Sequence, residues 1–137
     1  MTEGKIKVLF VDDRWKRFQY AQRVYAYCDL VIAPNFKEAM RAMSSRDFDY
    51  ISLDHDLDGC DFQDPDSDTC GMAIVRYISK TGWPEQRIKP AFLVHSSNLF
   101  AAHLLQVSLA ELGFEVSYKP CVYEVEHMTY NKEGLPK

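Results

Sequence analysis

The chain has 137 residues, of which 47% are hydrophobic and 26% are charged, and its formal net charge is −4 at pH 7. This length and composition are typical of one soluble globular domain with its own core, and they exclude a disordered chain. The net negative charge excludes a globally basic surface for duplex DNA, and the longest apolar runs have the length of strands, which excludes a membrane span. The first residues lack the apolar stretch of a signal peptide, so we expect a cytoplasmic protein.

The first part of the chain is predicted to form a strand, a helix and a second strand. Residues 6–11 are an apolar run of strand length, and residues 30–33 are another. Between them, residues 14–27 place large apolar side chains at helical spacing. These side chains are Trp15, Phe18, Ala21, Val24 and Tyr25. We therefore predict that Trp15 packs in the core and is not a stacking platform for a nucleobase.

The middle of the chain predicts a capped helix, a strand, an acidic insertion and another helix. Asn35, followed three residues later by Glu38, resembles a capping box. The inner side of the helix that it opens is expected to be Phe36, Ala39, Met40 and Met43. A strand is predicted at 49–53, and about 57–69 is too rich in Gly, Pro and Asp for regular structure. The next helix is expected at about 71–80.

The last part predicts a strand at 91–94, a helix from about Asn98 to Gly113, and a strand at 114–118. Gly113 suits the position that ends a helix. The inner face of this helix is expected to be Ala101, Leu104, Leu105, Ser108 and Leu112. From about residue 121 the tail shows no helical period, so we expect it to be irregular.

Strands that alternate with helices predict a parallel sheet covered on both faces. We therefore expect an α/β fold, a flavodoxin-like three-layer sandwich whose five parallel strands lie in the order 2-1-3-4-5. No internal repeat or linker interrupts the alternation, so residues 1–137 are expected to form a single domain.

The four cysteines are Cys28, Cys60, Cys70 and Cys121, and no two have Cys-x-x-Cys spacing. In a cytoplasmic protein this spacing favours reduced thiols. A zinc site made by Cys60, Cys70 and a histidine is the alternative, although the spacing matches no standard zinc pattern.

Polar clusters follow four of the predicted strands. They are Asp12-Asp13, Asp54-His55-Asp56, His95-Ser96-Ser97-Asn98 and Lys119-Pro120. Open α/β sheets bind ligands beyond the carboxyl ends of their strands, so we expect these clusters to line one crevice. Carboxylate oxygens are the ligands that Mg²⁺ prefers, which predicts a site for Mg²⁺ or Mn²⁺ and a phosphoryl group. The candidate metal ligands are Asp12, Asp13, Asp54 and Asp56.

Two histidines, His55 and His95, flank the predicted acidic site. An imidazole titrates near neutral pH, so either could act as a general acid or base or accept a phosphoryl group. The alternative is a structural histidine that is hydrogen-bonded beneath the loops. His103 and His127 have no acidic neighbours of this kind and are expected at the surface.

The remaining polar residues suit contacts with a substrate. Ser96, Ser97 and Asn98 could bind phosphate or ribose, or they could cap the helix that follows, and both interpretations stay open. Lys119 could neutralise charge on a phosphoryl group in the transition state, and the alternative is a solvated lysine at the end of a strand.

These clusters resemble the response-regulator receiver family over nearly the whole chain. Asp12-Asp13 resembles the paired acids that hold magnesium in that family, and Asp54 resembles the aspartate after strand three that accepts phosphate. Ser96, or His95 after a shift of one residue, falls at the position of a hydroxyl residue. Lys119, with the proline after it, resembles the lysine that contacts phosphate.

Other motifs depart from ordinary receivers. Leu53-Asp54-His55-Asp56-Leu57, the acidic insertion, Thr69-Cys70-Gly71 and Val94-His95-Ser96-Ser97-Asn98 are together similar to a variant receiver group of bacteria and their phages. That group is named for proposed processing of cyclic phosphates. The resemblance implies a metal-dependent phosphoesterase in which His95, His55, Asp54 and Lys119 carry the chemistry.

Three functions are compatible with these residues. The first is hydrolysis of a cyclic phosphate on a nucleotide or RNA end. The second is a stand-alone signalling receiver, phosphorylated on Asp54 by a partner kinase. The third is a non-catalytic binding module, such as a phage-encoded modulator of a host protein. The two histidine motifs favour the first.

Overall fold

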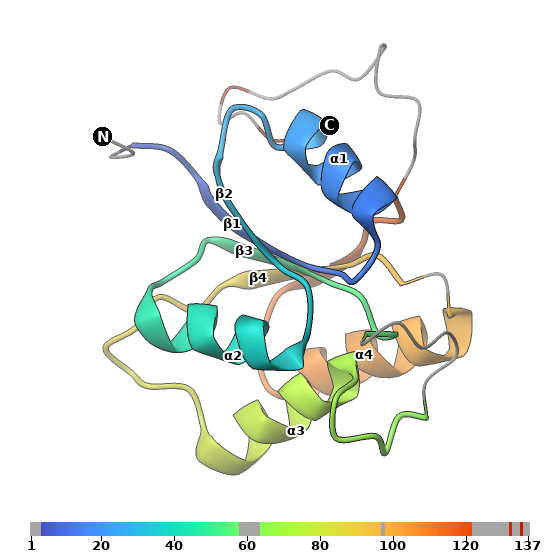
Figure 1. The fold of residues 1–137 in the computed structure, drawn as a ribbon. Helices are drawn as coiled ribbons and strands as arrows, with labels where there is room; N and C mark the ends of the chain where they lie inside the picture. Colours follow the sequence, from blue (N-terminus) through green and yellow to red (C-terminus); the bar gives the residue numbers. More distant parts are fainter. Residues whose placement is uncertain (1–3, 58–63, 97, 122–131, 133–134, 136–137) are drawn as a thin grey trace.

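The computed structural model describes residues 4–57, 64–96, 98–121, 132 and 135. The elements in chain order are β1 (Lys7–Val11), α1 (Trp15–Val24), β2 (Asp29–Ala33), α2 (Phe36–Ser45), β3 (Tyr50–Leu53), α3 (Gly71–Thr81), β4 (Ala91–Val94), α4 (Leu99–Glu111) and β5 (Val116–Tyr118) (Figure 1). Part of the predicted insertion, most of the tail, Cys60, Ser97 and His127 lie outside the described residues.

The five strands form one parallel sheet in the order β2-β1-β3-β4-β5, which confirms the predicted flavodoxin-like topology. The register aligns the ends of the central strands, since Val11 pairs with Leu53 and Leu53 pairs with Val94. The residues that follow β1, β3 and β4 therefore start from the same level of one sheet edge, where the predicted site lies.

Helices cover both faces of the sheet, with α1 on one face and α2, α3 and α4 on the other (Figure 1). Alternate residues of β1 serve the two cores, as the two-residue period of a strand requires. Val8 and Phe10 belong to the cluster beneath α1, whereas Leu9 and Val11 belong to the larger cluster beneath the other helices. Burying each of these side chains contributes about 1.5–3 kcal/mol to folding. The site is thus supported by a strand that is packed on both sides.

The helix caps and the buried helix faces agree in part with those predicted from the sequence. Asn35 caps α2, since its Oδ1 accepts a hydrogen bond from the Glu38 backbone N–H at 2.9 Å. The predicted face of α4 is partly wrong, because Ser108 is only half-buried while Leu109 is fully buried. Apolar residues occur on most sides of this helix, so their spacing does not define its inner face.

The prediction that Trp15 lies in the core is wrong, because its side chain is 62% exposed. The buried residues of α1 are Arg17, Ala21 and Val24, which form a stripe at helical spacing. Trp15 begins the helix two residues before Arg17, so it lies off this stripe. Among the described residues, none of the helices is long and apolar enough to cross a membrane.

Candidate metal and phosphate site

Sheet hydrogen bonds fix the backbone of the four residues that follow β1, β3, β4 and β5. The N–H of Asp12 donates to Ala33 O, and that of Asp54 donates to Val11 O. In the same way, His95 donates to Leu53 O at 3.1 Å, and Lys119 donates to Val94 O at 2.8 Å. Each of these residues therefore extends the ladder by one step before its chain turns away. The clusters predicted from the sequence share one edge of the sheet.

Three of the predicted site residues meet in a buried cluster. The Nε2 atom of His95 lies 2.9 Å from Asp12 Oδ2. Ligand atoms of Asp12, Asp54 and His95 all lie within 4.8 Å of one another, which is close enough for a shared metal ion. Each of these residues is at most 2% exposed. The sequence had assigned His95 to catalysis, and the structure also makes it a candidate ligand.

Arg17 is the fourth member of the cluster, and sequence reasoning missed it. Its Nη1 atom lies 3.1 Å from Asp12 Oδ2 and 3.2 Å from Asp54 Oδ2, and the residue is 6% exposed. The signal that could have identified it is its place on the inner stripe of α1, in line with Ala21 and Val24. A charged side chain on a core-facing stripe requires a buried partner of opposite charge.

The pKa values of the two carboxyl groups of the cluster are shifted in opposite directions. Burial works against ionisation of Asp12, but the hydrogen bond and charge of His95 and the charge of Arg17 outweigh it and lower its pKa. Burial dominates at Asp54 and raises its pKa to about 6, although His95 and Arg17 oppose the shift. The charge of Asp12 adds to this rise. Close carboxylates of which one is held ionised are typical of functional sites.

The ring of His95 is held on three sides. Its Nδ1 lies 2.7 Å from Ser52 Oγ, on the side opposite the contact with Asp12. The ring also stacks on Phe10, with a centroid separation of 4.5 Å and an interplanar angle of 3°. Ser52 is a buried hydroxyl in an otherwise apolar strand, and His95 gives it a partner. Both ring nitrogens therefore have fixed neighbours before any ligand binds.

His55 lies behind Asp54 and faces Asp56. Its backbone N–H donates to Asp54 Oδ1 at 2.8 Å, and its Nδ1 lies 3.0 Å from Asp56 Oδ1. Burial alone would lower the pKa of the fully buried His55, but contacts with Cys70 and Asp56 outweigh burial and raise it. Asp56, a predicted metal ligand, is therefore paired with His55.

Gly71, at the start of α3, allows a close approach to the site. Its N–H donates to His55 O at 2.8 Å. A Cβ atom at this position would lie 2.6 Å from Asp54 O and 2.9 Å from His55 Cα. Both are backbone atoms, so a side chain here would force the loop after β3 to move. This packing accounts for the glycine in the Thr69-Cys70-Gly71 motif.

The other predicted residues lie around the cluster. Ser96 is fully buried, and its Oγ accepts a hydrogen bond from the Asn98 N–H at 3.2 Å. Asn98 caps α4 through a hydrogen bond from the Ala101 N–H, so its capping role is confirmed. Asp13 is half-buried. Lys119 is exposed, and its side chain forms no hydrogen bond or ion pair with any described residue.

His103 and three of the four cysteines lie outside the buried cluster of Asp12, Asp54 and His95. His103 is exposed, as expected. Cys28, Cys70 and Cys121 are free thiols. Cys60, which the alternative zinc site requires, lies outside the described residues.

A family model described as the cyclic-phosphate processing receiver domain matches residues 7–111. The chain belongs to this family. The match spans β1 to α4 and includes Arg17 and every predicted site residue except Lys119.

Solved receiver domains share the fold of this family member. The CheY-like receiver domain from Methylobacillus flagellatus is 20% identical with a TM-score of 0.59, and the alignment covers 87% of this chain and 90% of that one. The receiver domain of Francisella response regulator 1452 is 18% identical with a TM-score of 0.60, and 88% of each chain is covered. A Burkholderia pseudomallei response regulator, solved with a phosphorylated aspartic acid, calcium ion and citrate, is 17% identical with a TM-score of 0.60 over 88% of this chain and 63% of that one. The sequence matches none of the curated proteins.

Proposed function

We propose that this receiver domain is a metal-dependent phosphoesterase that hydrolyses a cyclic phosphate on a nucleotide or an RNA end. The observation that carries the proposal is the position of His95, 2.9 Å from Asp12 within the buried cluster that also contains Asp54. An oriented imidazole supplies acid–base chemistry at neutral pH. Transfer of phosphate to an aspartate does not require such a group. The family description gives independent support.

The donor set fits a divalent cation. Two buried carboxylates need positive charge beside them, and carboxylate oxygens are ligands that suit both Mg²⁺ and Mn²⁺. Asp12 and Asp54 would hold the ion, and half-buried Asp13 is proposed as a further ligand, which leaves His95 Nε2 for proton transfer. Asp56 is also a proposed ligand, but it would first have to leave His55 Nδ1. When bound, the ion would polarise the phosphoryl oxygens as a Lewis acid.

The chain's own residues then serve the two proton transfers of hydrolysis. Water forms a new P–O bond and loses a proton, while one ester P–O bond breaks and the departing sugar oxygen gains a proton. We assign the second transfer to His95 Nε2, because Ser52 keeps the ring in place at Nδ1 while Nε2 exchanges Asp12 for substrate. His55 is a less accessible candidate for the first transfer, because it is fully buried.

Negative charge that develops on the phosphoryl group would be stabilised by residues that follow β4 and β5. Ser96 lies two residues after the end of β4. Lys119 directly follows β5, where its N–H donates to Val94 O, and its side chain is exposed. Donors that are aimed at developing charge are a major source of catalysis. Ser97 and Asn98 are proposed to contact phosphate or ribose, although the Asn98 side chain also caps α4.

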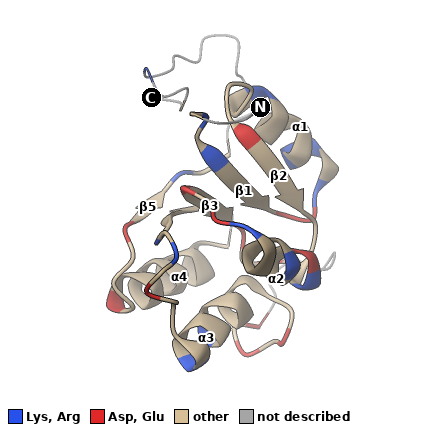
Figure 2. Ribbon diagram, turned by 90° about the vertical axis from the view of Figure 1, so that its left-hand side faces the viewer, with Lys and Arg blue, Asp and Glu red and all other residues tan. Residues whose placement is uncertain are grey.

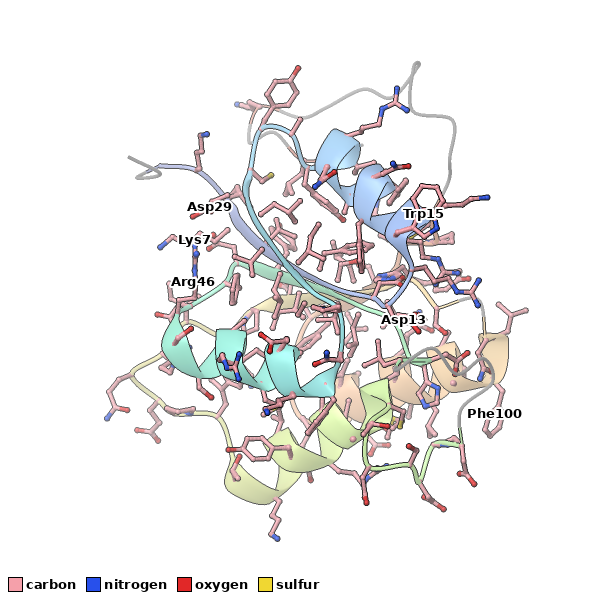
Figure 3. All side chains as sticks on the ribbon, in the orientation of Figure 1. Lys7, Asp13, Trp15, Asp29, Arg46 and Phe100 are labelled. Carbon is pink, nitrogen blue, oxygen red and sulfur yellow. The ribbon has the colours of Figure 1, made fainter. Side chains whose placement is uncertain are left out.

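The surroundings of the cluster support a nucleotide as the substrate. Figure 3 shows Trp15 and Phe100 on either side of Asp13 at this edge of the sheet, and they are 62% and 74% exposed. Exposed aromatic rings stack on bases of any sequence, at about 1–3 kcal/mol per base. In Figure 2, α1 carries Lys and Arg but no Asp or Glu, and Lys16 in its first turn is exposed, next to the buried Arg17 of the cluster. The helix would attract the phosphate groups of an RNA end.

The second candidate is a signalling receiver that is phosphorylated on Asp54 by a kinase. Its support is the shared fold with the Burkholderia response regulator, which carries a phosphorylated aspartic acid. Asp54 follows β3 and lies in the acidic cluster, as this function requires. The third candidate, a non-catalytic binding module, has no specific observation in its favour.

The test is a screen of 2′,3′-cyclic nucleotides and RNA with a cyclic-phosphate end, with Mg²⁺, with Mn²⁺ and with EDTA. We expect the wild type to show metal-dependent turnover, which is measured by ³¹P NMR. The turnover rate of His95→Ala should be lower by about a hundredfold or more. His103→Ala is the matched control, because that histidine is exposed on α4, and it should retain full turnover. Stable phosphorylation of Asp54 by acetyl phosphate, with no turnover of any cyclic phosphate, would decide for signalling.

A further inference from the structure

We propose that Arg17 occupies the metal position of this site, and that a divalent cation binds by displacing its guanidinium from Asp12 and Asp54. The inference rests on the metal site of the proposed function. It adds a regulatory step to that site, because metal binding becomes an exchange of one cation for another.

The hydrogen bonds around the two carboxylates leave one direction for a cation. Asp12 Oδ1 accepts from the Arg14 N–H at 3.0 Å, and Asp54 Oδ1 accepts from the His55 N–H at 2.8 Å. The Oδ2 atoms of both residues face one nitrogen, Arg17 Nη1, at 3.1 and 3.2 Å, and Asp12 Oδ2 also lies 2.9 Å from His95 Nε2. A metal ion that used these two oxygens would lie closer to them than this nitrogen does, at about 2.0–2.2 Å. The two cations therefore compete for the same place.

The charges of the cluster explain why the position is filled when no metal is bound. Asp12 and Asp54 are both almost fully buried, and the charge of Asp12 disfavours ionisation of Asp54. Removing the cation from a buried pair of this kind is strongly destabilising. Arg17 thus contributes one positive charge to the compensation of the carboxylates, beside that of His95. A divalent ion would bring two, so it could replace Arg17 without leaving a buried charge uncompensated.

Only one side chain has to move for this exchange. Arg17 belongs to the first turn of α1, whose position is fixed by Ala21 and Val24 farther along the same stripe. The helix can therefore stay in place while the long arginine side chain turns toward solvent. We expect the affinity of the site for metal to be set by this competition, and to be weaker than the ligand set alone would give.

The experiment measures Mn²⁺ and Mg²⁺ binding by isothermal titration calorimetry to the wild type, Arg17→Gln and Lys16→Gln. Lys16→Gln removes the same charge at the neighbouring position, where the side chain is exposed and outside the cluster. We expect Arg17→Gln to bind metal at least about tenfold more tightly than the wild type, and Lys16→Gln to stay within about twofold. Tight binding by Arg17→Gln with none by the wild type would also support the exchange. Equal or weaker binding by Arg17→Gln would overturn it and leave the proposed metal site intact.

A measurement on the wild type covers the case in which Arg17→Gln does not fold. The Nε–H signal of Arg17 in ¹H–¹⁵N NMR spectra should shift, and its exchange with water should accelerate, as Mg²⁺ saturates the protein. An unchanged signal at saturation would overturn the exchange. No metal binding by the wild type or by folded Arg17→Gln would overturn both the exchange and the metal step of the proposed function.

Discussion

Replacing Gly71 by alanine should destabilise the protein, although alanine is normally the better helix residue. Within a helix, alanine is favoured over glycine by about 0.5–1 kcal/mol. At Gly71 the new Cβ would lie 2.6 Å from Asp54 O and 2.9 Å from His55 Cα, and neither backbone atom can rotate away. Overpacking of this kind costs about 1–3 kcal/mol. The steric cost exceeds the gain in helix propensity, so we expect a net loss of about 1–2 kcal/mol.

Urea denaturation of Gly71→Ala in EDTA would measure this loss. Ser79→Ala is the matched control, because Ser79 is exposed on the same helix and reports the effect of alanine without a steric conflict. It should change the free energy of unfolding by no more than about 0.5 kcal/mol. Calorimetry should also show weaker Mn²⁺ binding by Gly71→Ala, since relief of the overlap moves the backbone of Asp54. A Gly71→Ala protein that is as stable as the wild type would refute the reasoning.

Two further predictions concern hydrogen bonding and pH. Ser52→Ala leaves His95 Nδ1 buried without the partner that it has at 2.7 Å, so the free energy of unfolding should fall by about 1–3 kcal/mol, whereas the exposed Ser117→Ala should have little effect. Equal unfolding curves for these two variants would contradict the role given to Ser52. Burial, with the charge of Asp12, raises the pKa of Asp54 from 3.8 to about 6, so the folded protein holds this proton more tightly than the unfolded chain does. In EDTA, the free energy of unfolding of the wild type should therefore fall by on the order of 3 kcal/mol relative to that of Asp54→Asn as the pH rises from about 4 to about 7. A difference between the two proteins that does not change with pH would contradict this prediction.

The topology could be predicted from the sequence because its determinants are local. Each strand is a short apolar run, and each is followed by a polar cluster, so the order of the sheet brings Asp12, Asp54 and His95 to one edge. The cap at Asn35 was also predictable, since its partner lies three residues away.

The features that were missed depend on contacts between distant parts of the chain. Arg17 is buried because Asp54, 37 residues later, lies beside it. Without that contact, its position on α1 would be occupied by an apolar residue. The size and helical spacing of Trp15 predict a buried aromatic, but the buried stripe of α1 passes through Arg17 instead. Periodicity identifies a helix, but the partners of the helix decide which of its faces is buried.

The stacking of His95 on Phe10 joins the proposed catalytic group to the hydrophobic interior. Phe10 is fully buried in the cluster beneath α1, and its ring lies parallel to the imidazole at 4.5 Å. A substitution beneath α1 that shifts the ring of Phe10 would therefore also move His95. Evolution toward a more thermostable protein and evolution toward faster turnover would compete for the same pair of rings, a conflict that is common where a reactive group is part of the core.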